Sequence, residues 1–89
     1  MKVHKLYILR HIADEYCLIP AGESVWDNKN IITISKAAAL LYDNIEEART
    51  EKELAELLMN EYGIDKATAD NDTREFLEYL KKHEIIRFS

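Results

Sequence analysis

The 89-residue sequence has one cysteine, one proline and two glycines, and no part of it is apolar over a long stretch. Cys17 cannot form an internal disulfide, so nothing in the sequence requires an oxidising compartment. No segment approaches the roughly 20 apolar residues of a transmembrane helix. The basic start over residues 1–5 lacks the cleavage pattern of a secretion signal. We therefore expect a soluble, cytoplasmic protein.

Positive charge is also scarce. The chain has 12 Lys and Arg residues against 17 Asp and Glu, which gives a formal net charge of -5. Nucleic acids and anionic membranes attract proteins through clustered Lys and Arg side chains. We therefore expect neither nucleic acid nor membrane as a partner.

The patterns of common active sites are missing as well. The sequence has no glycine-rich phosphate loop and no nucleophile elbow, and its three histidines and Cys17 lack the spacing of metal ligands. A chain of 89 residues forms one domain, over residues 1–89, and has no room for separate cofactor and substrate domains. The sequence predicts a non-catalytic protein with no cofactor and no metal.

The first third of the chain predicts strands. Residues 7–10 and 15–19 are rich in aromatic and β-branched side chains and flank a short turn, which indicates a hairpin. Residues 25–26 could cross as a strand or a loop. Residues 31–34, with the sequence Ile-Ile-Thr-Ile, predict a third strand that passes directly into a helix capped by Ser35.

The remainder predicts helices. Thr50 and Glu53 form a capping-box pattern that begins a second helix, and Gly63 is placed to end it. Asp65 can cap a third helix, and residues 85–88 follow as a short extended tail. The inward face of the third helix is predicted to carry Ala69, Thr73, Phe76, Leu77 and Leu80. The order predicts an α+β, winged-helix-like fold with a small three-stranded antiparallel sheet followed by three helices.

The direct junction between the third strand and the first helix predicts a function. A sheet edge held beside a helical layer is a natural groove for an extended peptide, which adds as a further strand and is selected by its side chains. Peptide groups at such an edge can bind a partner even where the side chains belong to the core.

The fragments, taken in order, resemble the PqqD-like family, which is named for a small protein of pyrroloquinoline quinone biosynthesis and is also called the RiPP precursor recognition element. The N-terminal matches are Leu9-Arg10, Glu15-Tyr16, Leu18-Ile19-Pro20, Gly22-Glu23, and Ile32-Thr33-Ile34-Ser35 with Ala38. The C-terminal matches are Thr50, Glu53-Leu54, Leu57-Leu58, Glu61-Tyr62, Ile64-Asp65, Ala69, Asp72, Phe76-Leu77, Leu80 and Ile85-Ile86. The chain departs from the pattern at Ser35 and Lys36, often Asn and Glu in the family, and at Glu84, which replaces a glycine.

The resemblance implies a chaperone that binds the leader of a ribosomally made precursor peptide and presents the peptide to a modifying enzyme, often a radical-SAM maturase. The leader of such proteins lies along the third strand, opposite the third helix. Carried onto this chain, the binding strand comprises Ile31, Ile32, Thr33 and Ile34. The facing wall comprises Thr73, Arg74, Leu77 and Leu80.

Simpler roles exist for several of these residues. Leu77 and Leu80 would serve equally in a plain core, and Arg74 would serve as a surface charge paired with Asp70 or Glu78. Two other functions also stay open. A winged-helix protein could bind DNA through its third helix, and the strand edge, with Trp26 and Phe88, could pair two copies of the chain as a homodimer.

Overall fold

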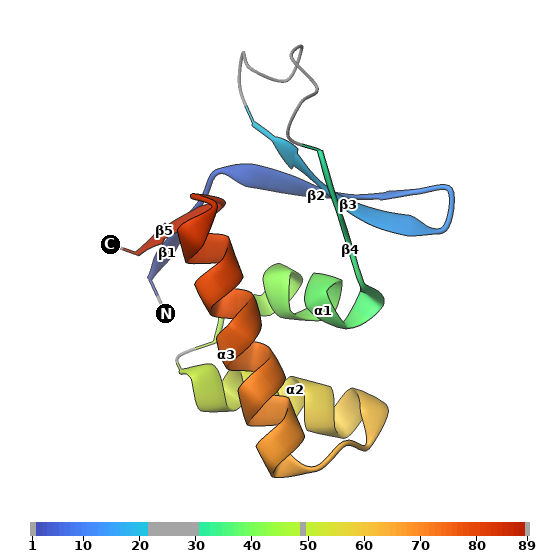
Figure 1. Ribbon diagram of the computed structural model, residues 1–89, viewed down its shortest axis with the longest axis vertical. Coiled ribbons are helices and arrows are strands. Elements are labelled where there is room, and N and C mark those ends of the chain that lie inside the picture. Colours follow the sequence, from blue (N-terminus) through green and yellow to red (C-terminus); the bar gives the residue numbers. More distant parts are fainter. Residues whose placement is uncertain (1, 22–30, 49, 89) are drawn as a thin grey trace.

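The computed structural model describes residues 2–21, 31–48 and 50–88, and within them the chain forms an α+β domain (Figure 1). The strands are β1 (Val3–Lys5), β2 (Tyr7–Ile12), β3 (Glu15–Pro20), β4 (Ile32–Ile34) and β5 (Ile86–Phe88). The helices are α1 (Lys36–Asn44), α2 (Glu51–Tyr62) and α3 (Lys66–Lys82). The predicted strand or loop at residues 25–26 lies outside the described residues.

The main sheet has the strand order β2-β3-β4 and is antiparallel throughout, which confirms the predicted three-stranded sheet. β2 and β3 are joined by Ala13 and Asp14, both at positive φ of 48° and 67°. A two-residue loop with two left-handed residues is a type I′ turn, whose twist matches that of the flanking strands. The hairpin is therefore closed by backbone geometry that the sequence supplies without glycine.

A second ladder was not predicted. β1 pairs with β5 in an antiparallel two-stranded sheet, with Val3 opposite Phe88 and Lys5 opposite Ile86. The predicted extended tail is thus a paired strand, and its partner is the start of the chain. Figure 1 shows both termini on the same side of the molecule, beside the upper end of α3.

The predicted caps are confirmed. The side chains of Ser35, Thr50 and Asp65 accept hydrogen bonds from backbone N–H groups three residues later, at 3.1, 3.2 and 3.4 Å. Gly63 ends α2 in the left-handed conformation at φ 66°, where a residue without Cβ meets no steric cost. These local signals set the start of each helix and hence the direction in which it leaves its loop.

The core lies between the sheet and the three helices. Its fully buried members include Leu18 of β3, Tyr42 of α1, Leu58 of α2 and Leu80 of α3. The Tyr42 hydroxyl donates a hydrogen bond of 2.6 Å to the carbonyl oxygen of Tyr7, which ties α1 to β2. Burial raises the pKa of Tyr42 to about 12, so this hydroxyl keeps its proton at neutral pH.

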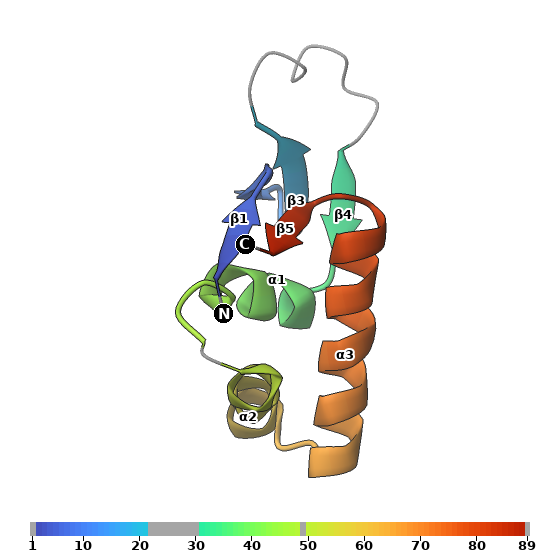
Figure 2. The ribbon, with the colours of Figure 1, turned by 90° about the vertical axis from the view of Figure 1, so that its left-hand side faces the viewer.

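The helices occupy one side of the main sheet. Figure 2 shows α1 directly beneath the strands, α2 below α1, and α3 upright on the side of the molecule where β4 forms the edge of the sheet. This arrangement brings the start of α1, the end of α2 and one face of α3 toward a common region below β4.

The end of α3 carries a left-handed residue that is not glycine. Glu84 has φ 55°, its N–H donates to Lys81 O at 3.1 Å, and Ile85 N–H donates to Leu80 O at 2.8 Å. This pair of bonds is the Schellman motif, in which glycine is preferred at the position of Glu84. The departure from the family pattern at Glu84 therefore places a side chain in a strained backbone conformation.

We expect Glu84→Gly to stabilise the domain, because glycine adopts positive φ without the steric cost that the Glu84 Cβ creates. The free energy of unfolding should rise by about 0.5–1 kcal/mol. The greater freedom of glycine in the unfolded chain offsets part of the stabilisation gained by removing the backbone strain. Urea unfolding followed by circular dichroism measures it. Glu78→Gly, in the interior of α3, should destabilise by about 1 kcal/mol, and a loss at both positions would refute the strain at Glu84.

Candidate functional site

β4 is one of the two edges of the main sheet, and among the described strands it pairs only with β3. The hydrogen bonds between the neighbouring strands show which peptide groups of β4 face its free side. Ala21 N–H donates to Leu6 O at 3.0 Å, so Leu6 and Ala21 form a hydrogen-bonded pair. Because such pairs alternate along an antiparallel ladder, β3 turns the peptide groups of residues 16, 18 and 20 away from β2 and toward β4.

The partners of Tyr16 and Leu18 on β4 are Ile34 and Ile32. The peptide groups of Ile32 and Ile34 are therefore used by β3, whereas the N–H and C=O of Thr33 point to the free edge. Pro20, which has no N–H, lies opposite Tyr7 at a position that needs no bond to β2. Thr33 thus offers one donor and one acceptor to an added strand.

The side chains of β4 alternate between the two faces of the sheet. Ile32 and Ile34 are half-buried and pack against the core, whereas the Thr33 side chain is exposed on the opposite face. Ile31, just before the strand, is 47% exposed. A strand added along β4 would place the side chains opposite Ile32 and Ile34 on the helical side, because directly opposite residues share a face.

A groove of about 580 Å³ lies where α1, α2 and α3 converge below β4. Each helix contributes a different part of its lining. The groove is lined by Ser35, Ala37, Ala38 and Leu41 at the start of α1, by Leu58, Tyr62 and Ile64 around the end of α2, and by Asp72, Glu75 and Phe76 on α3. The lining is largely apolar, and Ser35 joins it directly to the end of β4.

Three of the four predicted wall residues on α3 are buried in the core. Thr73, Leu77 and Leu80 are 1%, 3% and 0% exposed and face the other helices and the sheet. A peptide cannot reach these side chains unless the helix moves. Their role as peptide contacts stays a prediction, and their observed role is packing.

Arg74 lies on a different side of α3 from the groove. It lines a small cavity together with Glu51, Lys52, Lys66 and Asp70, next to the start of α2. Arg74 and Phe76 are two residues apart, which separates them by roughly 200° around the helix axis. The structure therefore brings Ser35, Phe76 and the end of β4 together and leaves Arg74 outside this group.

The α3 residues that do reach the groove were not predicted as site residues. Asp72, Glu75 and Phe76 form a stripe at three- and four-residue spacing that runs beside the core stripe of Ala69, Thr73, Leu77 and Leu80. Periodicity in the sequence placed Phe76 on the inward face together with the core residues. It does not say which side of the core stripe faces β4, because that depends on how the helices are arranged around the sheet.

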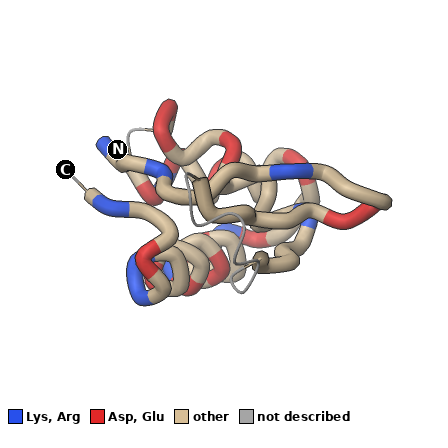
Figure 3. Tube along the Cα trace, turned by 90° about the horizontal axis from the view of Figure 1, so that it is seen from above, with Lys and Arg blue, Asp and Glu red and all other residues tan. Residues whose placement is uncertain are grey.

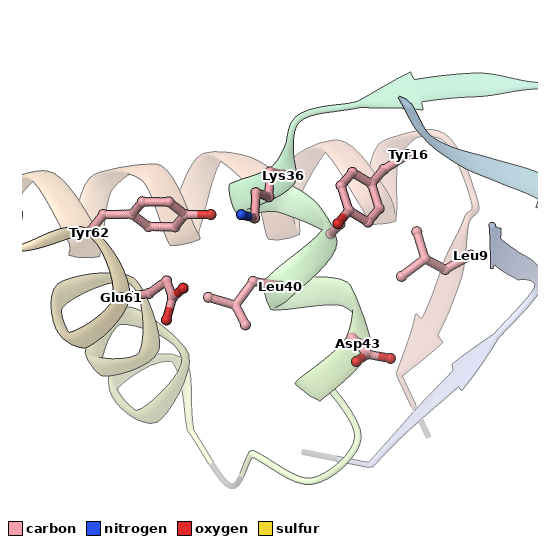
Figure 4. A pocket seen from close by; sticks show the side chains of 8 residues that line it. Leu9, Tyr16, Lys36, Leu40, Asp43, Glu61 and Tyr62 are labelled. Carbon is pink, nitrogen blue, oxygen red and sulfur yellow. The ribbon is translucent and has the colours of Figure 1, made fainter. Parts of the chain in front are cut away.

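A second cavity, of about 200 Å³, lies on the other side of α1 (Figure 4). Figure 4 shows Tyr62 and Glu61 of α2 facing Lys36 and Leu40 of α1, with Tyr16 and Leu9 reaching in from the sheet. Tyr62 lines both cavities. Its residue Leu9 belongs to β2, the opposite edge strand of the main sheet, so this cavity lies away from the β4 edge.

Other kinds of site find little support in the part of the chain that the structure describes. Over residues 2–21, 31–48 and 50–88, no three His, Cys, Asp or Glu side chains are grouped so that they could hold a metal ion. Over the same ranges, no helix combines the length and the apolar character needed to cross a bilayer. Cys17 is a free, buried thiol on β3.

Comparison with known proteins gives a family and a fold. Residues 17–86 match the family model described as coenzyme PQQ synthesis protein D (PqqD). A search of the curated proteins finds no match. Two solved structures share the fold across nearly the whole chain.

The first is "TbiB1 in Complex with the TbiA(beta) Leader Peptide", with a TM-score of 0.73 and 23% identity over 98% of this chain and 95% of that chain. The second is "Lasso peptide synthetase B1 complexed with the leader peptide", with a TM-score of 0.75 and 14% identity over 97% of this chain and 95% of that chain. Both of those proteins were solved with a leader peptide bound.

Proposed function

Because the chain belongs to the PqqD family, we propose that it binds the leader of a ribosomally made precursor peptide and presents that peptide to a modifying enzyme. The observation that carries the proposal is the free edge of β4 above an apolar groove of about 580 Å³. The leader peptides bound to both fold relatives support it as well.

The edge of β4 supplies affinity that depends little on the leader sequence. The leader adds as a strand, and its backbone exchanges two hydrogen bonds with Thr33, whose N–H and C=O point outward. Ile31, two residues earlier, continues the same alternation. Main-chain bonds of this kind fix the leader in register without selecting its side chains.

The groove supplies the selection. Leader residues opposite Ile32 and Ile34 direct their side chains toward the helices, and further residues continue past Ser35 into the groove. There Ala37, Ile64 and Phe76, which are all partly exposed, offer an apolar floor. A leader is disordered when free, so the apolar side chains that it buries must offset the entropy of ordering it, and a few anchors should dominate the affinity.

The enzyme that acts on the presented peptide is a separate protein in this proposal, and the family resemblance suggests a radical-SAM maturase. The domain itself contributes binding and no chemistry. The proposed setting is the cytoplasm, where precursor peptides are made and where the single buried thiol of Cys17 stays reduced.

Charge argues against the DNA-binding alternative. Figure 3 shows Lys and Arg positions scattered along the trace and interspersed with Asp and Glu. On α3, the helix that would enter a groove of DNA, Lys66 is already paired with Asp70 at 2.8 Å. Asp72, Glu75 and Glu78 would add three negative charges next to phosphate.

A second copy of the chain is the competing occupant of the β4 edge. Of the side chains proposed for self-association, Phe88 is 44% exposed on β5, while Trp26 lies outside the described residues. β5 and β4 belong to different sheets. A homodimer through β4 would therefore compete with the leader, and one through β5 would not.

We expect Phe76→Ala to weaken leader binding by about tenfold or more, because the phenylalanine side chain is the largest apolar surface that α3 presents to the groove. Isothermal titration calorimetry with the leader of a precursor encoded beside the gene measures the change. Phe88→Ala removes the same side chain from an exposed position on β5 and should leave the affinity within about twofold of the unmodified protein. Equal losses at both positions, or none at Phe76, would place the binding surface elsewhere.

A further inference from the structure

Two carboxylates interrupt the largely apolar lining of the groove. Asp72 and Glu75 lie three residues apart on α3, on the same side as Phe76. At this spacing the Cβ atoms of two helical residues are about 5–6 Å apart, so one guanidinium or ammonium group can contact both carboxylates. No lysine or arginine is among the residues that line this groove.

Asp72 and Glu75 face a groove whose lining, over the described residues, contains no cationic side chain. Asp70 pairs with Lys66 at 2.8 Å on another side of the helix. Glu75 accepts a hydrogen bond of 3.2 Å from the Asn71 amide, which orients the carboxylate and leaves its charge in place. Among the described residues, Asp72 and Glu75 belong to neither of the two ion pairs, Lys5–Glu46 and Lys66–Asp70.

Deepening the proposed function, on which it rests, we propose that this groove selects leaders that carry an arginine or lysine next to an apolar anchor. The apolar side chain packs against Phe76 and Ile64, and the basic side chain is held by Asp72 and Glu75. Arginine is favoured over lysine, because its planar guanidinium can bond two carboxylates at once.

The spacing of the leader motif follows from the geometry of helix and strand. Asp72 precedes Phe76 by four residues, which is about 6 Å along the axis of α3. In an extended peptide, side chains on one face are two residues apart, which is about 6.6 Å. The basic residue and the apolar anchor should therefore be separated by one residue, with the anchor closer to the segment that pairs with β4.

The carboxylates have a possible structural role that the test must separate from selection. α1 begins at this groove and has no acidic residue in its first turn. Asp72 and Glu75 are therefore the groove carboxylates that could interact with the positive end of the α1 dipole. If that is their only role, neutralising them lowers the stability of the domain and leaves the choice of peptide unchanged.

The probe is a display library of random 12-residue peptides, selected in parallel on the unmodified protein and on two double variants. Asp72→Asn with Glu75→Gln neutralises the groove carboxylates. Glu56→Gln with Glu78→Gln removes the same charge from an exposed site on α2 and from a side of α3 that does not line the groove. Urea unfolding of all three proteins establishes that each one is folded under the conditions of the peptide selection.

We expect peptides selected on the unmodified protein and on the control variant to be enriched in arginine and lysine one residue away from an apolar residue. This enrichment should vanish on the Asp72→Asn/Glu75→Gln variant. Replacing the basic residue of a selected peptide by methionine should weaken its binding to the unmodified protein about three- to tenfold, and to the neutralised variant less than twofold. The charge reversal Asp72→Lys with Glu75→Lys should instead enrich aspartate and glutamate.

The possible failures are distinguishable. Peptides that bind at the β4 edge but show the same basic content on all variants would overturn the charge selection and leave the proposed function intact. A library that yields no binding peptide for any of the proteins would overturn both the charge selection and leader binding itself.

Discussion

Replacing Thr33 by proline is expected to abolish leader binding while the domain stays folded. Proline removes the one N–H of β4 that points to the free edge, and its ring occupies the path of an added strand. The bonds between β3 and β4 use Ile32 and Ile34, so the substitution removes none of them. Calorimetric titration with the leader should show no heat of binding, and circular dichroism should show an unchanged spectrum.

The controls separate the loss of the donor from a change of side chain. Thr33→Val keeps the N–H and the β-branched shape, and it should bind the leader as the unmodified protein does. Glu46→Ala, at an exposed site that forms an ion pair of 3.4 Å with Lys5, should also bind normally. A folded Thr33→Pro protein with normal affinity would refute strand addition at β4.

If the proline variant does not fold, methylating the backbone of the leader tests the same hydrogen bonds by changing the peptide in place of the protein. Methyl groups placed on successive backbone nitrogens of the leader should block binding at every second position, because alternate N–H groups face β4. A loss that is uniform, or absent at all positions, would contradict an added strand.

The second large effect concerns stability. Leu80→Ala should lower the free energy of unfolding by about 2–5 kcal/mol, because the side chain is 0% exposed and its removal leaves a cavity among the three helices and the sheet. Such a loss is a large part of the roughly 5–15 kcal/mol that stabilises a domain. Urea unfolding at constant ionic strength measures it.

The matched control is Arg74→Ala, which removes an exposed side chain on another side of the same helix and should change the stability by less than about 0.5 kcal/mol. Leader affinity measured on the folded fraction of the Leu80→Ala protein should be nearly normal. A loss of leader affinity without a loss of stability would show that Leu80 contacts the leader and is not a core residue.

Much of the fold could be predicted because its signals are local. Ser35, Thr50, Asp65 and Gly63 act through bonds to residues within four positions of themselves, and the structure contains all four caps as predicted. The Ile-Ile-Thr-Ile run also specified a strand directly before a helix. Short-range chemistry of this kind is readable from one sequence.

The unpredicted features depend on contacts between distant parts of the chain. β1 is three residues long and polar at His4 and Lys5, so its pairing with β5 has no local signal. On α3, one helical stripe faces the core and its neighbour faces the groove. The difference between Leu80 and Phe76 is a rotation of the helix about its axis, and the sheet and α1 set that rotation, not the pattern within α3.

The central claim is that a leader adds as a strand at the free edge of β4. The most direct test is an NMR titration of isotopically labelled protein with the leader of a precursor encoded beside its gene. The account predicts saturable amide shifts centred on residues 31–35 and 72–79, and, for an antiparallel leader, intermolecular Hα contacts at Ile32 and Ile34 but not at Thr33. Saturable shifts confined to the β2–β3 hairpin or to the β1–β5 ladder, or an intermolecular Hα contact at Thr33 in place of Ile32 and Ile34, would contradict it.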